Sequence, residues 1–303
     1  MKSYLKVDYT KISIELNSVF LSYFVLQRYF GSNISATAST NNKNIKVKFK
    51  CFGKGKKNGI VSDYTFDRER VGSVYNTTIY TGLLIFPFLK SCYKFLFPKS
   101  SVVGIPEVYQ SAFRTSVLEP FEGLLADDGF RMIHAGFVNY QKKGIIVCGK
   151  SGHGKSTIIE HLSKIDGSKV GADNYVFING KECFFFPEPF RSGNSISRFE
   201  FLLYGKRING FSVLEKGEVD FFYLISRTFE ENDNLSFEDI EGVYLSGIIE
   251  EMYTEEGEGL FSKKNCPIQL NESNFSDICT IKVGISNGSH LVRKAVDEII
   301  EKL

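Results

Sequence analysis

A glycine-rich stretch in the middle of the chain has residue types and spacing suited to binding phosphate. Residues 147–159 read VCGKSGHGKSTII, and Gly149, Gly154, Lys155 and Ser156 fit the pattern G-x-x-x-x-G-K-[ST]. Glycines let the backbone curl so that successive N–H groups point into one concavity, and the start of a following helix adds its positive dipole end. The stretch therefore predicts an anion site.

The side chains of this loop predict which anion it binds. Lys155 is expected to neutralise β- and γ-phosphate oxygens, and the Ser156 hydroxyl to bind a Mg²⁺ ion that bridges the same phosphates. A glycine turn that only caps a helix is the alternative, but it does not explain Lys155 and Ser156 together. The expected cofactors are therefore ATP and Mg²⁺, although the sequence does not distinguish ATP from other nucleotides. The remaining loop residues expected at the cofactor are Ser151, Gly152, His153 and Thr157.

The elements that must position the loop are a strand before it and a helix after it. KGIIVCG (143–149) predicts a buried strand, and STIIEHLSKI (156–165) has apolar residues at helical spacing. FRMIHAGFVNY (130–140) predicts a second strand, which turns into the first around residues 141–143. LEPFEGLLADDG (118–129) is typical of a helix that ends in a turn. The required strand, loop and helix are thus all predicted.

One acidic residue follows the loop closely. Asp173, in KVGADNYVF, comes after enough chain for a helix, a turn and a short return strand. YVFING and CFFFPEP then predict a hairpin that turns at Asn179-Gly180, and FFYLIS (221–226) predicts a buried strand. Arg191, after this hairpin, could clamp a γ-phosphate or a substrate carboxylate; a surface arginine at a strand end is an equal alternative.

HAGFVNYQKKGIIVCGKSGHGKST and GADNYVFINGKECFFFPEPF together resemble the HPr kinase-related branch of the phosphoenolpyruvate carboxykinase-like superfamily, over about residues 115–190. The resemblance implies an α/β (α+β) fold, with a mixed, strongly curved sheet, a P-loop and flanking helices. It also implies transfer of a nucleotide γ-phosphoryl group to a serine-like hydroxyl. By position, Asp173 matches the acid that accepts the hydroxyl proton or holds Mg²⁺, and His134 matches a histidine on the strand before the loop.

Two departures from that family affect the expected function. Asn174 and Thr157 stand where the bacterial HPr kinases have acidic residues. The chain therefore resembles relatives that act on free serine or on a peptide in a biosynthetic cluster. We expect a Mg-ATP-dependent kinase with a peptide or small amino-acid-like acceptor, and the alternative is a catalytically inactive nucleotide-binding regulatory or scaffold protein. Decarboxylation of the carboxykinase type would need a larger set of metal ligands.

The first part of the chain predicts a smaller lobe. We expect residues 1–114 to form an N-terminal lobe that selects the substrate and residues 115–303 to form the catalytic domain, with a soft boundary in the turn-rich stretch 100–116. SVFLSYFVLQRYF (18–30) predicts a packing helix. NIKVKFKC (44–51) alternates strictly, which predicts a strand with lysines on one face and Ile45, Val47, Phe49 and Cys51 on the other. The lysines indicate a solvated face and a basic turn; a phosphate-binding stripe is the alternative.

Two helices are predicted near the C-terminal end. SFEDIEGVYLSGIIEEMY begins at Ser236 with a pattern like a capping box, and SHLVRKAVDEIIEKL (289–303) carries an apolar stripe. We expect the second helix to dock on its own domain rather than on a partner.

Composition limits the remaining classes of function. Apolar residues make up 43% of the 303 residues, charged residues 24%, and the net charge is +2, so we expect a folded protein with neither a nucleic acid nor a membrane as partner. Six cysteines without a C-x-x-C pair predict reduced, mostly buried thiols. The N-terminus lacks a signal-like apolar region and the longest apolar run, 81–89, is short, so a cytoplasmic location is expected. Oligomeric state is left open.

Overall fold

The structure is a computed structural model of the 303-residue chain. The helix predicted at 18–30 lies outside the residues that it describes. The described residues are 5–9, 12–16, 43–59, 64–82, 89–90, 92–93, 108, 111–149, 152–185, 189–191, 208–211, 214, 216–228, 235–239, 277–284 and 288–303.

The chain divides into two compact units. The first unit comprises Met1–Asp127 with Gly193–Ile208, and the second comprises Asp128–Ser192 with Asn209–Leu303. Both contain a mixed sheet and few helices, which makes the fold α+β. The functional roles expected of residues 1–114 and 115–303 stay predictions.

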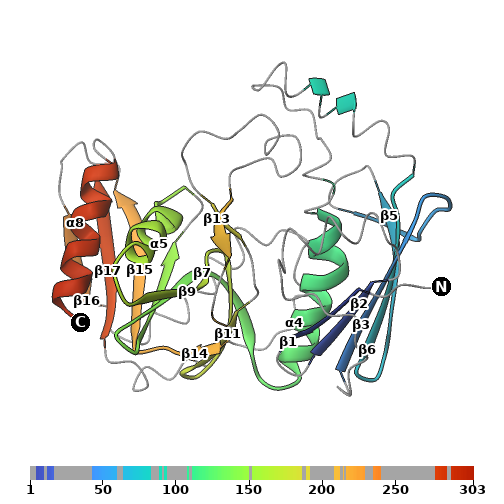
Figure 1. The fold of residues 1–303 in the computed structure, drawn as a ribbon, viewed down its shortest axis with the longest axis horizontal. Helices are drawn as coiled ribbons and strands as arrows, with labels where there is room; N and C mark the ends of the chain where they lie inside the picture. The colour runs from blue at the N-terminus through green and yellow to red at the C-terminus, as the bar shows by residue number, and fades with distance from the viewer. Residues whose placement is uncertain are drawn as a thin grey trace. The chain divides into compact units, whose positions relative to one another are not determined.

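A six-stranded mixed sheet forms the first unit (Figure 1). Strands β2, β3 and β6 run parallel to one another, and the other neighbours pair antiparallel. Ile45, Val47 and Phe49 are buried while the alternating lysines are exposed, which confirms the predicted faces of this strand. The prediction that Cys51 lies on the buried face is wrong, because the strand ends at Lys50 and Cys51 is exposed. In spatial order the strands are β1 (Leu5–Tyr9), β2 (Ile12–Leu16), β3 (Lys43–Lys50), β6 (Val74–Tyr80), β5 (Thr65–Val71) and β4 (Lys57–Asn58).

A helical segment packs on this sheet. It contains a π-helical turn, η1 (Arg114–Leu118), and continues into α4 (Glu119–Ala126), with Pro120 in the first turn of α4. The predicted helix is therefore present, but residues 111–116, expected as a boundary, are helical instead. Phe113, Val117 and Phe121 are buried there, so the apolar side chains of this turn-rich stretch are used in a core.

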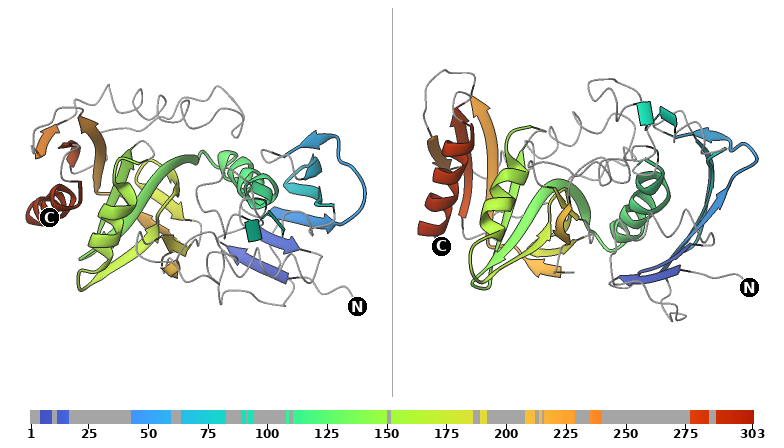
Figure 2. Two further views of the ribbon diagram at one scale, coloured as in Figure 1. Left: turned by 90° about the horizontal axis from the view of Figure 1, so that it is seen from above. Right: turned by 45° about the horizontal axis from the view of Figure 1, so that its top comes forward.

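The second unit has a nine-stranded mixed sheet. Strands β8, β15 and β17 are parallel, and all other neighbours are antiparallel. Figure 2 shows the long strand β7 arching along it. The main order is β14 (Lys216–Glu218), β11 (Glu182–Phe185), β10 (Tyr175–Asn179), β7 (Arg131–Tyr140), β8 (Lys143–Gly149), β15 (Phe221–Thr228), β17 (Asp277–Gly284) and β16 (Leu235–Asp239); β9 (Ser168–Ala172) pairs with β7, and β12 (Pro189–Arg191) and β13 (Ile208–Phe211) form a separate pair.

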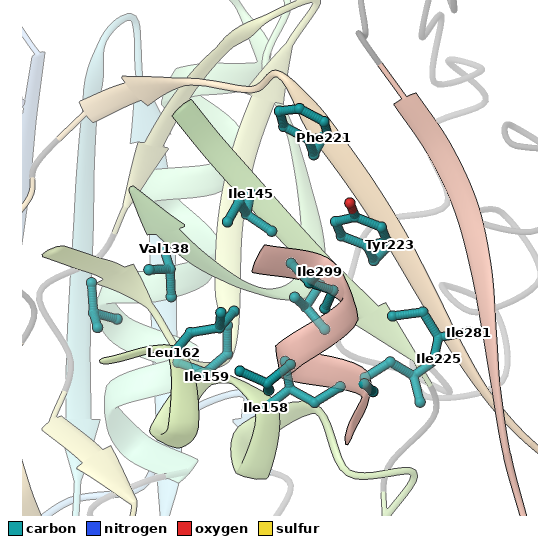
Figure 3. Packing of buried hydrophobic residues seen from close by; sticks show 14 residues of the cluster. Val138, Ile145, Ile158, Ile159, Leu162, Phe221, Tyr223, Ile225, Ile281 and Ile299 are labelled. Carbon is teal, nitrogen blue, oxygen red and sulfur yellow. The ribbon is translucent and has the colours of Figure 1, made fainter. Parts of the chain in front are cut away.

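Helices α5 (Lys155–Ser163) and α8 (Gly288–Glu301) cover one face of this sheet. Figure 3 shows Ile158, Ile159 and Leu162 of α5 together with Ile299 of α8, packed against β15 and β8. The C-terminal helix is thus confirmed, and it docks on its own unit. A second apolar cluster, which includes Phe137, lies on the opposite face, so the central strands are buried on both sides.

Several strand predictions are confirmed, and two local predictions are wrong. The strands predicted at 130–140, 143–149 and 221–226 are present within a residue or two. The hairpin loop is Gly180-Lys181 instead of Asn179-Gly180, because Asn179 still pairs with Glu182 and Gly180 supplies the positive φ of 58°. The helix predicted from Ser236 is wrong at its start, because residues 236–239 belong to strand β16, where pairing with β17 outweighs a local capping pattern. The rest of that predicted helix, 240–253, lies outside the described residues.

Within the described residues, no helix has the length and apolar character needed to cross a membrane.

Candidate functional site

The glycine-rich loop joins the carboxyl end of β8 to the amino end of α5, as the motif requires. Gly149 pairs with Ile225 of the parallel strand β15, and a Cβ atom at Gly149 would lie 2.8 Å from the Ile225 carbonyl oxygen. Gly154 begins the helix with φ 104°, a conformation that favours glycine, and its carbonyl accepts a 3.0 Å hydrogen bond from the Ile158 N–H. Glycine is therefore needed at both ends of the loop.

Lys155 is held inside this loop. It is buried, with 5% of its surface exposed, and its Nζ donates a 2.7 Å hydrogen bond to the Gly149 carbonyl oxygen. Lysine is among the residues least often found buried. A buried ammonium group that bonds to the loop's own backbone lies where an anion bound by the loop would meet it.

Of the other residues predicted at the cofactor, the structure describes some and leaves others undescribed. Ser156 and Thr157 lie half-buried in the first turn of α5, and Gly152 is exposed. His153 is half-buried, with its Nδ1 3.4 Å from the Ile225 carbonyl oxygen, which places the imidazole beside β15. Ser151 and the side chain of Arg191 lie outside the described part of the structure; the backbone of Arg191 ends β12.

Asp173 lies at an interruption in the sheet. Strands β9 and β10 both pair antiparallel with β7, one after the other, and Asp173 and Asn174 are the two residues between them. The Ala135 N–H donates a 3.1 Å hydrogen bond to the Asn174 carbonyl oxygen, and Ala135 itself is opposite Cys148 at the end of β8. The sheet register therefore brings Asp173 level with the start of the glycine-rich loop, although eighteen positions separate it from Lys155 in the sequence.

The carboxylate of Asp173 is buried and lacks a hydrogen-bond partner within the part of the chain that the structure describes. Only 2% of the residue is exposed, and neither oxygen has a hydrogen-bond partner among the described residues. Burying a carboxylate without hydrogen bonds or a counter-charge is costly. Such a carboxylate suits a site completed by a cation or by a substrate hydroxyl. Magnesium, which takes few protein ligands and keeps water and phosphate oxygens in its shell, fits this single acid.

His134 lies on β7 at the same end of the sheet. It is opposite Tyr175 of β10, with the two ring centroids 6.1 Å apart, and it is half-buried. Alternation along the strand puts it on the same face as Gly136, which lies against Ile159 of α5. The predicted catalytic residues thus come from β7, from the β9–β10 junction and from α5.

Sequence reasoning missed one residue that allows this arrangement to pack. A Cβ atom at Gly136 would lie 2.4 Å from Ile159 Cγ1, so this glycine allows α5 to approach β7. Its signal was a glycine inside an otherwise apolar strand. Cys148, on the strand before the loop, is buried, and burial raises the pKa of its thiol to about 12 despite the opposing effect of the Lys155 charge.

Metal ligation by a larger cluster finds no support in the described residues. They contain no group of three or more His, Cys, Asp or Glu side chains placed to hold a metal ion together. A metal at this site would therefore depend on few protein ligands and on the phosphates of a bound nucleotide.

Comparison with known proteins gives little additional information. No protein-family model and no curated protein matches the chain. One solved structure with similarity is the HPr(Ser) kinase/phosphatase from Coxiella burnetii, with 15% sequence identity, 57% of this chain and 97% of that chain covered, and a TM-score of 0.29. A likeness at this level does not bear on function, so the residues of the site must carry the functional argument.

Proposed function

We propose that the chain is a Mg-ATP-dependent phosphotransferase that transfers the γ-phosphoryl group to a serine-like hydroxyl of a peptide or a small amino-acid-like substrate. The observation that carries this proposal is a pair of buried, oppositely charged residues at the same end of one sheet. The Lys155 ammonium group donates a hydrogen bond to the Gly149 carbonyl oxygen of the loop, and Asp173 has no hydrogen-bond partner among the described residues. The kind of acceptor rests on the family resemblance of residues 115–190.

The loop residues would bind the nucleotide. Lys155 would exchange its bond with the Gly149 carbonyl for the β- and γ-phosphate oxygens, where its charge offsets the negative charge of the transferring group. Ser156 and Asp173 would hold Mg²⁺, which supplies charge neutralisation at the phosphates when bound. The loop amides between Gly149 and Lys155, together with the amino end of α5, would orient the phosphate chain.

Asp173 would also position the acceptor. As the acceptor oxygen bonds to the γ-phosphorus and the bond to the β-phosphate oxygen breaks, the hydroxyl proton would pass to the Asp173 carboxylate. His134, on the neighbouring strand, would help to orient the acceptor, and Arg191 would clamp a phosphate or a substrate carboxylate. The substrate-selecting role of residues 1–114 belongs to the same proposal.

Phosphoryl transfer by the purified protein with Mg²⁺ and ATP tests this function, with acceptors from free serine to serine-containing peptides. Lys155→Ala should lower nucleotide affinity roughly 100-fold, because a charged hydrogen-bonding partner of the phosphates is lost. Lys169→Ala is the matched control, since Lys169 is an exposed lysine of the same unit, and it should behave as wild type.

Two results would contradict the proposal. If Lys155→Ala binds nucleotide as tightly as wild type, the loop is not a phosphate site. If wild type binds ATP but transfers phosphate to no acceptor, the chain is instead a nucleotide-binding regulatory or scaffold protein, the alternative that Asn174 and Thr157 favour.

A further inference from the structure

The β3–β4 region of the first unit concentrates positive charge. Residues 43–62 contain seven lysines and no acidic residue, whereas the whole chain has a net charge of only +2. Three of these lysines alternate along the exposed face of β3, and three more lie in the following loop and in β4. The proposed phosphotransferase site, in the other unit, leaves this feature without a role. The lysines are Lys43, Lys46, Lys48, Lys50, Lys54, Lys56 and Lys57.

The loop from Cys51 to Lys56, which we call the basic loop, is fixed to the end of its own sheet. The Gly55 N–H donates a 2.8 Å hydrogen bond to Thr65 Oγ1, and the Lys56 N–H donates one of 2.8 Å to Asp67 Oδ1. A Cβ atom at Gly55 would lie 2.4 Å from the carbonyl carbon of Phe66, so this close approach needs a glycine. Figure 2 shows the basic loop, in blue, extending beyond the strands that it connects.

The basic loop displays an apolar side chain. Phe52 is 77% exposed, the largest exposed fraction among the exposed large apolar residues described. Lys54 and Lys56 are also exposed, and no ion pair joins either of them to an acid within the described residues. A rigid loop that presents a phenyl ring between lysines combines the two features by which peripheral proteins bind anionic bilayers.

We propose that the basic loop docks the first unit on an anionic lipid bilayer. Phe52 enters the boundary between headgroups and acyl chains, while Lys54 and Lys56 contact the negatively charged headgroups. The nearly neutral charge of the whole chain predicted no membrane partner; the local distribution of charge leads to a different conclusion. The proposal does not depend on phosphotransferase activity, because it uses neither the glycine-rich loop nor Asp173 nor His134.

A bilayer suits this surface better than a nucleic acid does. Nucleic acid would have to extend over the open face of the sheet, where Asp67 and Glu69 share the face with the lysines and repel phosphate. The aromatic ring on that face, Tyr80, lies under Lys50, with Nζ 5.6 Å from the ring centroid, and its hydroxyl donates a 3.2 Å hydrogen bond to Asp67 Oδ2. This ring is therefore not free for base stacking. A flat bilayer would contact only the tip of the basic loop and not the acidic residues on the sheet face.

Tryptophan fluorescence tests the docking directly, because the chain contains no tryptophan. Phe52→Trp should show a blue-shifted emission with vesicles of phosphatidylcholine and phosphatidylserine, no shift with phosphatidylcholine alone, and loss of the shift at high salt. The matched control is Val71→Trp, since Val71 is 60% exposed at the other end of β5, away from the basic loop. It should show no shift on either vesicle.

Vesicle co-sedimentation of the full chain measures how much the two lysines and Phe52 each contribute to binding the bilayer. Lys54→Gln/Lys56→Gln should lower the partition coefficient roughly 25-fold, at about fivefold for each lysine. Phe52→Ser should lower it roughly tenfold through lost apolar burial. Both variants should melt at the wild-type temperature, since the changed side chains are exposed.

Three results would overturn the proposal. The first is that the wild-type protein sediments equally with vesicles that contain phosphatidylserine and with vesicles of phosphatidylcholine alone, or that it sediments with neither. The second is equal loss of binding in Phe52→Ser and Val71→Ser. The third is a basic loop that binds single-stranded RNA, with the same lysine dependence, and does not bind vesicles.

Discussion

Each unit contains buried polar groups, but a buried polar cluster in the first unit is hydrogen-bonded internally, whereas a buried carboxylate in the second has no hydrogen-bond partner among the described residues. In the first unit the Tyr64 hydroxyl lies 2.9 Å from Ser111 Oγ and 2.8 Å from Thr115 Oγ1, and all three residues are buried. In the second unit the buried carboxylate of Asp173 has no hydrogen-bond partner among the described residues. A buried polar cluster whose members are hydrogen-bonded stabilises a fold. A buried ionisable group without a hydrogen bond or counter-charge lowers stability unless a ligand supplies the missing partner. The comparison therefore separates a structural cluster from a candidate binding site.

Lack of a partner alone does not make a site. Thr77 Oγ1 and Ser116 Oγ in the first unit are also buried without a hydrogen-bond partner among the described residues. These are neutral hydroxyls, whose burial costs far less than that of a carboxylate. What distinguishes Asp173 is its acidic group together with its place level with the glycine-rich loop.

Asp173→Asn tests the comparison most severely. We expect phosphoryl transfer to fall by about 10²- to 10⁴-fold, because the residue proposed as proton acceptor and metal ligand is lost. At the same time the nucleotide-free protein should become more stable, by roughly 1 kcal/mol or more, because a buried unpaired carboxylate is replaced by a neutral amide of the same shape. Turnover assays and thermal unfolding without nucleotide measure the two effects.

Asp220→Asn is the matched control for that variant. The Asp220 carboxylate accepts a 2.8 Å hydrogen bond from the Gly144 N–H in the same unit, so its charge is used in the native fold. Replacing it should lower stability slightly, since a charge-assisted hydrogen bond becomes a neutral one, and should leave transfer unchanged. If Asp173→Asn lowers stability as Asp220→Asn does, the Asp173 carboxylate is satisfied and the comparison fails.

Gly136→Ala tests whether the close approach of α5 to β7 holds the two charged residues in register. The added Cβ would lie 2.4 Å from Ile159 Cγ1, so α5 must move, at a cost of about 1–3 kcal/mol in the free energy of unfolding. Nucleotide affinity should fall as well, because α5 carries Lys155. Chemical denaturation and nucleotide titration measure both.

The double variant Gly136→Ala/Ile159→Ala separates positioning from general damage. Removing the Ile159 side chain makes room for the new methyl group, so the two changes should cost less together than the sum of their separate costs. Nucleotide affinity should recover in part. Strictly additive losses in both measurements would show that contact between these residues does not position the helix.

Tyr64→Phe examines the satisfied cluster. The change removes one hydroxyl and leaves Ser111 and Thr115 without the bonds they share with it, which should destabilise the protein by about 1–2 kcal/mol. Nucleotide affinity should not change, because the cluster lies in the first unit. Thermal unfolding and nucleotide titration check this, and a loss of affinity with unchanged stability would reverse the roles given to the two clusters.

Prediction from sequence succeeded where a local pattern sufficed. The strand and helix around the loop follow from apolar runs and from the glycines, and the faces of β3 follow from strict alternation. The prediction failed where distant pairing decides. The residues from Leu235 to Asp239 carry a capping pattern, but their pairing with β17, some forty residues away, makes them a strand.

The candidate site was predictable only in part for the same reason. The sequence identified Lys155 and Asp173 as candidates, but their common level on the sheet depends on the register of β7 with β8, β9 and β10. Neither the missing partners of Asp173 nor the fit of Gly136 against Ile159 has a signal in local spacing. Both are properties of packing between elements.

The two units also differ in how they place the same residue type, which gives the smallest expected effect. Cys51 is exposed at the basic loop, while Cys148 is buried beside the glycine-rich loop and burial raises the pKa of its thiol to about 12. Since the thiolate is the reactive form, iodoacetamide at neutral or mildly alkaline pH should modify Cys51 and leave Cys148 unmodified until the protein is unfolded. Peptide mass spectrometry locates the label, and nucleotide affinity should stay unchanged because Cys51 lies in the other unit from the glycine-rich loop. Rapid labelling of Cys148 in the native protein would mean that the strand before the loop opens to solvent. The core around Asp173 would then not be closed, and its carboxylate could be hydrated instead of waiting for a ligand.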